Sequence, residues 1–138
     1  MTFYWSDDYV TGIQQIDNQH KKIIKQLNKV YKLIDLDLSI QEIVSAFEVL
    51  IHIIEVHFNT ENRLMQGMNS KDFKIHINEH GIYLSNLKVI CKTIVNSVNR
   101  KKLRSIIDWQ ISCLYEEHII TYDKILGESI IKNNNASV

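Results

Sequence analysis

The sequence predicts an all-α fold, an up-down-up-down antiparallel four-helix bundle preceded by an irregular N-terminal arm. Apolar residues recur at helical spacing through four long segments, as Ile43, Phe47, Leu50 and Ile54 do in the second. Proline is absent and glycine occurs only 4 times in 138 residues, whereas a β fold would need more turn-forming residues. The links between the segments are short, so neighbouring helices are expected to run antiparallel.

The expected segments are an arm over residues 1–17, helices over about residues 18–34, 40–65, 71–95 and 101–131, and a frayed tail from Lys132. Asp17 is the expected N-cap of the first helix. Ser39 and Glu42 form a predicted capping box at the start of the second helix. Gly67 is the expected stop of that helix, and Ser70 the cap of the third.

Length and charge limit the kind of protein. A chain of 138 residues has room for one domain, 1–138. Its 16 basic and 16 acidic residues cancel, so no net charge attracts nucleic acid or anionic lipid. The basic cluster from Arg100 to Arg104 is interpreted as a solvated face.

The termini and cysteines indicate where the protein works. No signal-peptide pattern is visible at the N-terminus, and no apolar run approaches the ~20 residues that span a bilayer. We therefore expect no membrane partner. Cys91 and Cys113 alone do not suggest a disulfide framework, so a cytoplasmic location is the simpler expectation.

Polar residues at helical spacing form the main functional signal. The candidate metal ligands are His20, His57, Glu61, His76, His80, His118 and Asp123. His57 with Glu61, and His76 with His80, are four residues apart, which places each pair about 40° apart on one helix face. Burying such groups without partners costs on the order of 1–3 kcal/mol each, and a metal would satisfy them together.

His118 and Asp123 do not fit an ideal helix, because five residues separate their directions by about 140°. Either the helix is locally widened by a π-type turn, or the two side chains reach different sides of a site wider than one ion. His52 points about 140° away from His57, so we leave it out as a surface or supporting residue.

The ligand set favours iron, manganese or zinc over copper(I) or calcium. Seven protein ligands are too many for one tetrahedral zinc. They suit two six-coordinate ions if both carboxylates bridge and a solvent-derived oxygen forms a third bridge. One coordination position then stays open, on one ion, for a small ligand.

Four segments of the chain resemble the motifs of the hemerythrin family: residues 16–22, 57–61, 76–80 and 118–123. Trp5 and Gly12 also match positions in the arm of the bacterial members. The resemblance extends from about Trp5 to Leu126, nearly the whole chain, and the spacing of its four motifs is highly specific.

This resemblance implies two iron ions per chain, joined by an oxygen-derived bridge, that bind O2 reversibly. His76, His80 and His118 would hold one iron and His20 and His57 the other, open one, while Glu61 and Asp123 bridge. No side chain need act as acid or base, so the resemblance implies oxygen storage, delivery or scavenging rather than catalysis.

Four residues are expected to line the oxygen pocket: Ile23, Phe58, Tyr115 and Ile119. Tyr115 stands where the family usually has a leucine. We hypothesise that its hydroxyl donates to the bound oxygen ligand; the alternative is that it turns away to another partner. Asn62, where a second glutamate is common, is expected to touch no ligand.

Other functions remain open on the sequence. His76, Glu79 and His80 also fit the H-x-x-E-H pattern of a zinc peptidase, which would leave the remaining ligands unexplained. A ferritin-like di-iron oxidase would normally carry Glu-x-x-His pairs, and none occurs here. A peroxide- or nitric-oxide-handling enzyme and a diffusible O2 or iron sensor stay as alternatives, as do monomeric and small homo-oligomeric states.

Overall fold

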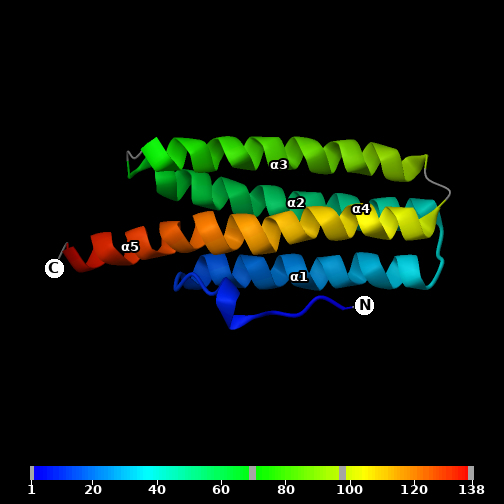
Figure 1. Cartoon of the computed structure of the whole chain (residues 1–138), viewed down its shortest axis with the longest axis horizontal. Helices are drawn as coiled ribbons and strands as arrows, with labels where there is room; N and C mark the ends of the chain where they lie inside the picture. Colours follow the sequence, from blue (N-terminus) through cyan, green and yellow to red (C-terminus); the bar gives the residue numbers. More distant parts are fainter. Residues whose placement is uncertain (1, 69–70, 97–98, 137–138) are drawn as a thin grey trace.

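The computed structural model describes residues 2–68, 71–96 and 99–136. Its long elements are the helices α1 (Gln14–Asp35), α2 (Ile40–Gln66), α3 (Lys71–Val95), α4 (Arg100–Ser112) and α5 (Lys124–Ala136), with the π-helical segment η2 (Cys113–Asp123) between the last two. In Figure 1, α4, η2 and α5 form one continuous rod beside α1, α2 and α3, and successive rods run in opposite directions. No strand occurs in the described residues. The predicted all-α, up-down-up-down fold is confirmed.

The first helix begins earlier than its cap residue suggested. α1 starts at Gln14, with Ile13 in the N-cap position, so the arm ends before residue 14 and the prediction that Asp17 caps the helix is wrong. The Asp17 carboxylate instead accepts hydrogen bonds from the amide and hydroxyl of Thr11, both at 2.8 Å. A carboxylate in the first turn of a helix can serve amide groups outside it, and here it fastens the arm. Gly12, with a φ of +86°, makes the turn that this contact needs.

The predicted capping box of α2 is confirmed. Ser39 Oγ accepts from the amide of Glu42 at 3.2 Å, and the Glu42 carboxylate accepts from the amide of Ser39 at 3.2 Å. α2 ends at Gln66, with Gly67 as its C-cap in the right-handed region. Ser70, the expected cap of α3, lies outside the described residues.

The fourth rod is longer and less regular than expected. The helix predicted over about residues 101–131 begins at Arg100, widens into a π-helix over Cys113–Asp123, and continues to Ala136. The expectation of a frayed tail from Lys132 is therefore wrong for residues 132–136. Neither proline nor glycine stands in that stretch to end the helix.

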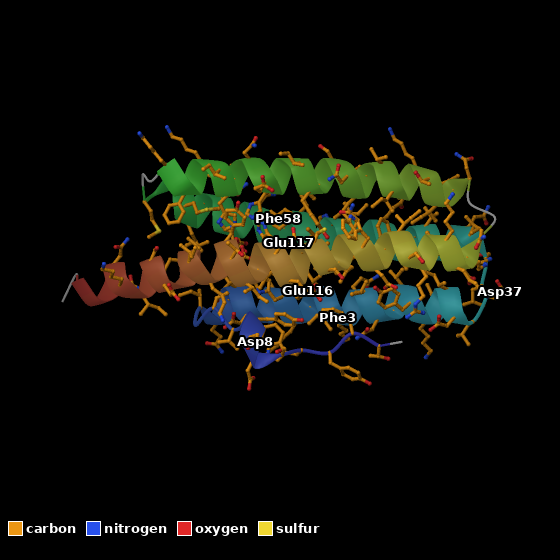
Figure 2. The ribbon with its side chains drawn as sticks, viewed as in Figure 1. Phe3, Asp8, Asp37, Phe58, Glu116 and Glu117 are labelled. Atoms are coloured by element: carbon orange, nitrogen blue, oxygen red, sulfur yellow. The ribbon has the colours of Figure 1, made fainter. Side chains whose placement is uncertain are left out.

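Two arginines of the basic cluster at the start of α4 contact the last residue of α1 and the link that follows it. Arg100 Nε lies 2.6 Å from the Asp37 carboxylate, and Arg104 forms an ion pair with Asp35. Figure 2 shows Asp37 at the end of the bundle opposite the C-terminus. The interpretation of this cluster as a solvated face is confirmed for Lys101 and Lys102, which are exposed, but not for the two arginines, which bind α4 to the end of α1 and to the link.

Two apolar clusters fill the interior. The larger extends from Ile23 toward the Asp37 end of the bundle and includes Phe47 and Leu50. The smaller, at the other end, consists of Ile16, Met65, Phe73 and Leu126. On α1 and α3 the polar residues singled out from the sequence fall between these two clusters, and on the other two rods they overlap the edge of the larger one at Phe58 and Ile119.

One helix of the described chain, α2, is long and apolar enough by length and composition to cross a membrane. The search for uninterrupted apolar runs in the sequence did not single out this helix. Half of that apolar stretch is buried inside the bundle.

Candidate metal centre

The structure brings all the sequence-predicted ligands into one buried cluster. α1 supplies His20, α2 supplies His57 and Glu61, α3 supplies His76 and His80, and η2 supplies His118 and Asp123. Their exposed fractions lie between 0% and 7%. His52 is exposed and outside the cluster, as expected.

The cluster divides into two overlapping groups of possible ligand atoms. One contains three histidines, His76, His80 and His118, and the other contains His20 and His57. Glu61 and Asp123 belong to both groups, and within each group the atoms lie within 4.8 Å of one another. The two carboxylates therefore lie where they could bridge two cations.

The π-helix explains how His118 and Asp123 reach the same centre. A π-helix pairs residues five apart in the backbone ladder, so it brings together side chains that an α-helix would direct about 140° apart. His118 Nε2 lies 3.1 Å from Asp123 Oδ1. Of the two explanations left open by the sequence, the widened helix is the one found.

The histidine rings point their Nε2 atoms at one another. His20 and His57 approach to 2.9 Å, His76 and His118 to 3.1 Å, and His80 and His118 to 3.0 Å, all measured between Nε2 atoms. Each such pair can share only one proton. Lone pairs that converge in this way are the arrangement that a bound cation requires.

The carboxylates are left without ordinary hydrogen bonds. Both Glu61 oxygens and Asp123 Oδ1 are buried and have no hydrogen-bond partner among the described residues. Glu61 Oε1 lies 2.5 Å from His57 Nε2, and Asp123 Oδ1 lies 2.9 Å from His76 Nε2. These short contacts lack hydrogen-bond geometry, as expected for atoms directed at a common centre. The donor set therefore fits a metal site.

Charge inside the cluster shifts several pKa values. Burial lowers the pKa of His57, but the charges of Glu61 and Asp123 outweigh it and raise the value to about 9. For His76, contacts with the same carboxylates outweigh burial and raise the pKa to about 9. For His80 burial dominates, and the pKa falls to about 4. Burial raises the pKa of both carboxyls, yet the facing histidines hold each well below its usual range.

Two amide side chains orient two of the histidines, and the sequence did not predict either. Gln19 Oε1 lies 2.7 Å from His57 Nδ1, and Asn62 Oδ1 lies 2.7 Å from His80 Nδ1. The expectation that Asn62 touches no ligand is wrong. Asn62 extends from α2 to α3 beside the cluster. One sequence signal was available, because each amide residue is next to a candidate ligand: Gln19 precedes His20, and Asn62 follows Glu61.

Tyr115 is fully buried, and its hydroxyl donates to the backbone carbonyl of His20 at 2.9 Å. Burial raises the pKa of this hydroxyl well above its ordinary value, so it stays protonated. This contact agrees with the alternative that Tyr115 turns to another partner. That its hydroxyl donates to a bound oxygen ligand stays a prediction. Phe3 and Tyr9 of the arm pack on the Tyr115 ring, with centroids 4.8 and 5.0 Å away.

The other expected pocket residues, Ile23, Phe58 and Ile119, are also fully buried. The Phe58 ring stacks on His80, with centroids 3.9 Å apart and planes 8° apart. Their apolar side chains border the cluster on the side of the larger core. Whether they line an oxygen pocket stays a prediction.

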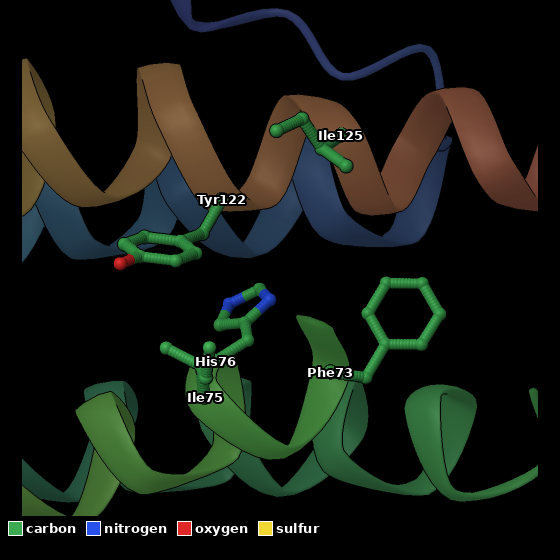
Figure 3. Close-up of a pocket in the computed structure, with 5 residues that line it drawn as sticks. All are labelled: Phe73, Ile75, His76, Tyr122 and Ile125. Atoms are coloured by element: carbon green, nitrogen blue, oxygen red, sulfur yellow. The ribbon is translucent and has the colours of Figure 1, made fainter. Parts of the chain in front are cut away.

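A surface cavity of about 300 Å³ lies beside the cluster. Figure 3 shows His76 in this cavity between Phe73 and Tyr122, with Ile75 and Ile125 completing the lining. The Tyr122 ring lies 5.3 Å from His76 and 5.4 Å from His118, measured between centroids. Tyr122 was not among the expected pocket residues.

The chain is similar to proteins of one family. Residues 11–122 match the model of the hemerythrin HHE cation-binding domain. A bacteriohemerythrin from Clostridium acetobutylicum is 22% identical over 125 residues, which cover 88% of this chain and 96% of that protein.

Two further relatives carry the same name. A bacteriohemerythrin from Methylococcus capsulatus is 27% identical over 127 residues, which cover 87% of this chain and 89% of that protein. A bacteriohemerythrin from Pseudomonas aeruginosa is 31% identical over 80 residues, which cover 58% of this chain and 52% of that protein.

Proposed function

The chain belongs to the hemerythrin HHE cation-binding family, and from this premise we propose that it binds O2 reversibly at a carboxylate-bridged pair of iron ions. The observation that carries the proposal is the pair of overlapping ligand groups that share Glu61 and Asp123. One group would hold an iron through His76, His80 and His118. The other would hold the second iron through His20 and His57.

Distances within the cluster support six-coordinate ions. With metal–ligand bonds of about 2.1 Å, adjacent ligands lie ~3.0 Å apart on an octahedral ion and ~3.4 Å apart on a tetrahedral one. The Nε2 separations of 2.9, 3.0 and 3.1 Å agree with the octahedral value. A histidine-rich, thiolate-free set with two carboxylates suits iron.

The unequal histidine count would leave a vacant position for O2. Two bridging carboxylates and one oxygen bridge supply three ligands to each ion, so three histidines complete one ion and two leave the other open. When bound, the ferrous pair would supply two electrons to O2 and regain them on its release.

The protein's own part would be to hold the ions and exclude water. The apolar residues that border the cluster, Ile23, Phe58 and Ile119, would limit the access of water and protons. Tyr115 would close this wall while its hydroxyl stays on the His20 carbonyl. No acid or base is required, which supports storage, delivery or scavenging of O2 rather than catalysis. We also propose a cytoplasmic location, supported by the free thiols Cys91 and Cys113.

The test is anaerobic purification with metal analysis, followed by optical spectra through cycles of O2 addition and removal. We expect about two irons per chain and a charge-transfer band that appears with O2 and bleaches without it. His57→Ala should abolish the band, and His52→Ala, which changes an exposed histidine on the same helix, should leave it intact. One zinc per chain would overturn the proposal, and irreversible bleaching with substrate turnover would indicate an oxidase.

A further inference from the structure

Three side chains form a hydrogen-bond chain that ends on His57. Gln19 Oε1 lies 2.7 Å from His57 Nδ1, and Gln19 Nε2 donates to Thr60 Oγ1 at 3.1 Å. The Thr60 hydroxyl donates to the backbone carbonyl of Val56 at 3.1 Å. Thr60 is only 5% exposed, so water has little access to its hydroxyl, while Gln19 is half-buried.

The chain of bonds has one direction, because its last acceptor is a carbonyl. Val56 O can only accept, so the Thr60 hydroxyl proton points to it and the Thr60 oxygen is left to accept. The Gln19 NH2 group meets that oxygen, which turns Gln19 Oε1 toward His57. An amide oxygen can only accept, so His57 Nδ1 must carry the hydrogen.

This order fixes which nitrogen of His57 is free for a cation. With the hydrogen on Nδ1, the lone pair of neutral His57 lies on Nε2, the atom that faces His20 and Glu61. If the Gln19 amide flipped, its NH2 would face Nδ1 instead, and the hydrogen would move to Nε2. That form could not bind a metal through Nε2.

We propose that Thr60 and Gln19 are positioning residues that hold His57 in the Nδ1–H form and so prepare it to bind the cation. The inference rests on the proposed metal site but not on its reaction with O2. Contacts of this kind typically change metal affinity by 10–100-fold. His80 is held by the Asn62 amide, and no second hydrogen bond like that of Thr60 occurs there among those found in the described residues.

Zinc is the probe, because it binds without redox chemistry and its binding does not depend on O2. Thr60→Val removes the hydroxyl at nearly constant volume and allows the Gln19 amide to flip. In Thr60→Val, we expect the Kd of the weaker-bound zinc, the one assigned to the group with His20 and His57, to rise about 10-fold or more, as measured by competition with a chelator. Nitrogen-15 NMR of the metal-free protein near pH 10 should show the Nδ1–H form of His57 in the parent and a mixture in the variant.

Two variants separate hydrogen bonding from packing. Thr60→Ser keeps the hydroxyl and should restore the parent Kd to within about 3-fold. Thr93→Val is the matched control, because Thr93 also donates to the carbonyl four residues earlier, at 3.0 Å, but on the exposed surface of α3. It should leave zinc binding unchanged.

A double-mutant cycle tests the direction of the amide. Glutamate at position 19 has two acceptor oxygens and no donor, so it cannot present an NH2 group to His57. In the Gln19→Glu background, Thr60→Val should therefore change the Kd by less than about 3-fold.

Three outcomes would each overturn the inference. Thr60→Val could weaken zinc binding equally in the parent and Gln19→Glu backgrounds, or Thr60→Ser could weaken it as much as Thr60→Val does. Thr60→Val could also leave both the zinc Kd and the His57 form as they are in the parent. If zinc binding responds to the variants as expected but the iron form binds no O2, the proposed function is overturned and the inference stands. A parent that binds no zinc would overturn the inference with the metal site.

Discussion

The two halves of the bundle bury different kinds of side chain. Around Phe47 and Leu50 the interior is apolar, and each side chain is stabilised by leaving water. Around Glu61 and Asp123 the interior holds five imidazoles and two carboxylates, and three of the four carboxylate oxygens have no hydrogen-bond partner among the described residues. The apolar half needs no further partner, whereas the polar half holds buried groups that a cation would satisfy.

The difference shows how a demanding site is kept in shape. The smaller apolar cluster, with Ile16 and Met65, closes the polar region on one side, and the larger one closes it on the other. The rods are therefore positioned by apolar packing on both sides of the ligands. We infer that the fold survives metal loss and that the metal adds stability to the polar half.

The largest effect should come from the apolar half. Phe47→Ala removes a buried aromatic side chain and should lower the free energy of unfolding by about 3–5 kcal/mol, equally with zinc and with chelator. Urea unfolding in both conditions measures it. Phe58→Ala is the matched variant: it should cost a similar amount and also weaken zinc binding, because Phe58 stacks on His80. A metal-dependent loss in Phe47→Ala would contradict the separation of the halves.

Metal removal should have the next largest effect. Free zinc at 100 times its Kd should stabilise the folded protein by about 2.7 kcal/mol relative to chelator. The Tm should rise with zinc concentration, while circular dichroism in chelator still shows a helical protein. Loss of helical structure on chelation would show that apolar packing alone does not hold the bundle.

pH should act on the metal-free protein in a predictable direction. His57 and His76 have pKa values raised to about 9, against about 6.5 for unfolded histidine, so their contribution is complete below pH 6.5 and is lost as pH rises to 9. The free energy of unfolding should fall by on the order of 1 kcal/mol per pH unit for each histidine in that window. His80 has its pKa lowered to about 4, so it should lower the free energy of unfolding only as pH falls from 6.5 toward 4.

Urea unfolding in chelator at pH 6.5, 7.5 and 8.5 measures this fall. Zinc affinity should change in the opposite direction over the same range, because protons compete with the metal for the histidines. Stability in chelator that rises with pH would contradict the charge distribution inferred for the cluster.

The smallest effect should come from the contact between the two halves. Tyr115→Phe removes one hydrogen bond, to the His20 carbonyl, and should cost about 1 kcal/mol with a minor change in zinc affinity. If the iron form binds O2, its dissociation and oxidation rates should match those of the parent. A large change in either rate would show that the hydroxyl leaves the carbonyl when the site is occupied.

Helix periodicity predicted the fold and singled out seven residues that the structure gathers into one buried cluster, because the spacing of side chains along a helix is a local property. The i,i+4 pairs needed only the pitch of an α-helix, and the misfit of His118 with Asp123 left the π-helix as one of two explanations. The contacts of Gln19 and Asn62 depend on how far one helix lies from another, which spacing does not contain.

The same limit left the partner of Tyr115 open, because that partner is a backbone carbonyl on another helix. The prediction of the N-cap of α1 failed for a different reason. Asp17 has the side chain of an N-cap, but the competing amides of Thr11 and Gly12 bind it from outside the helix. A cap residue identifies a helix start only when no other donor is near.

The π-helix η2 turns less per residue than the α-helices on either side of it. Cys113–Asp123 therefore holds more residues than an α-helix with the same number of turns, and α5 is rotated as a result. That rotation places Leu126 in the smaller apolar cluster and leaves Ile125 half exposed. Deleting one residue from η2 would therefore rotate Asp123 and every side chain of α5 about the helix axis. The number of residues in η2 thus couples the geometry of the metal site to the packing of α5.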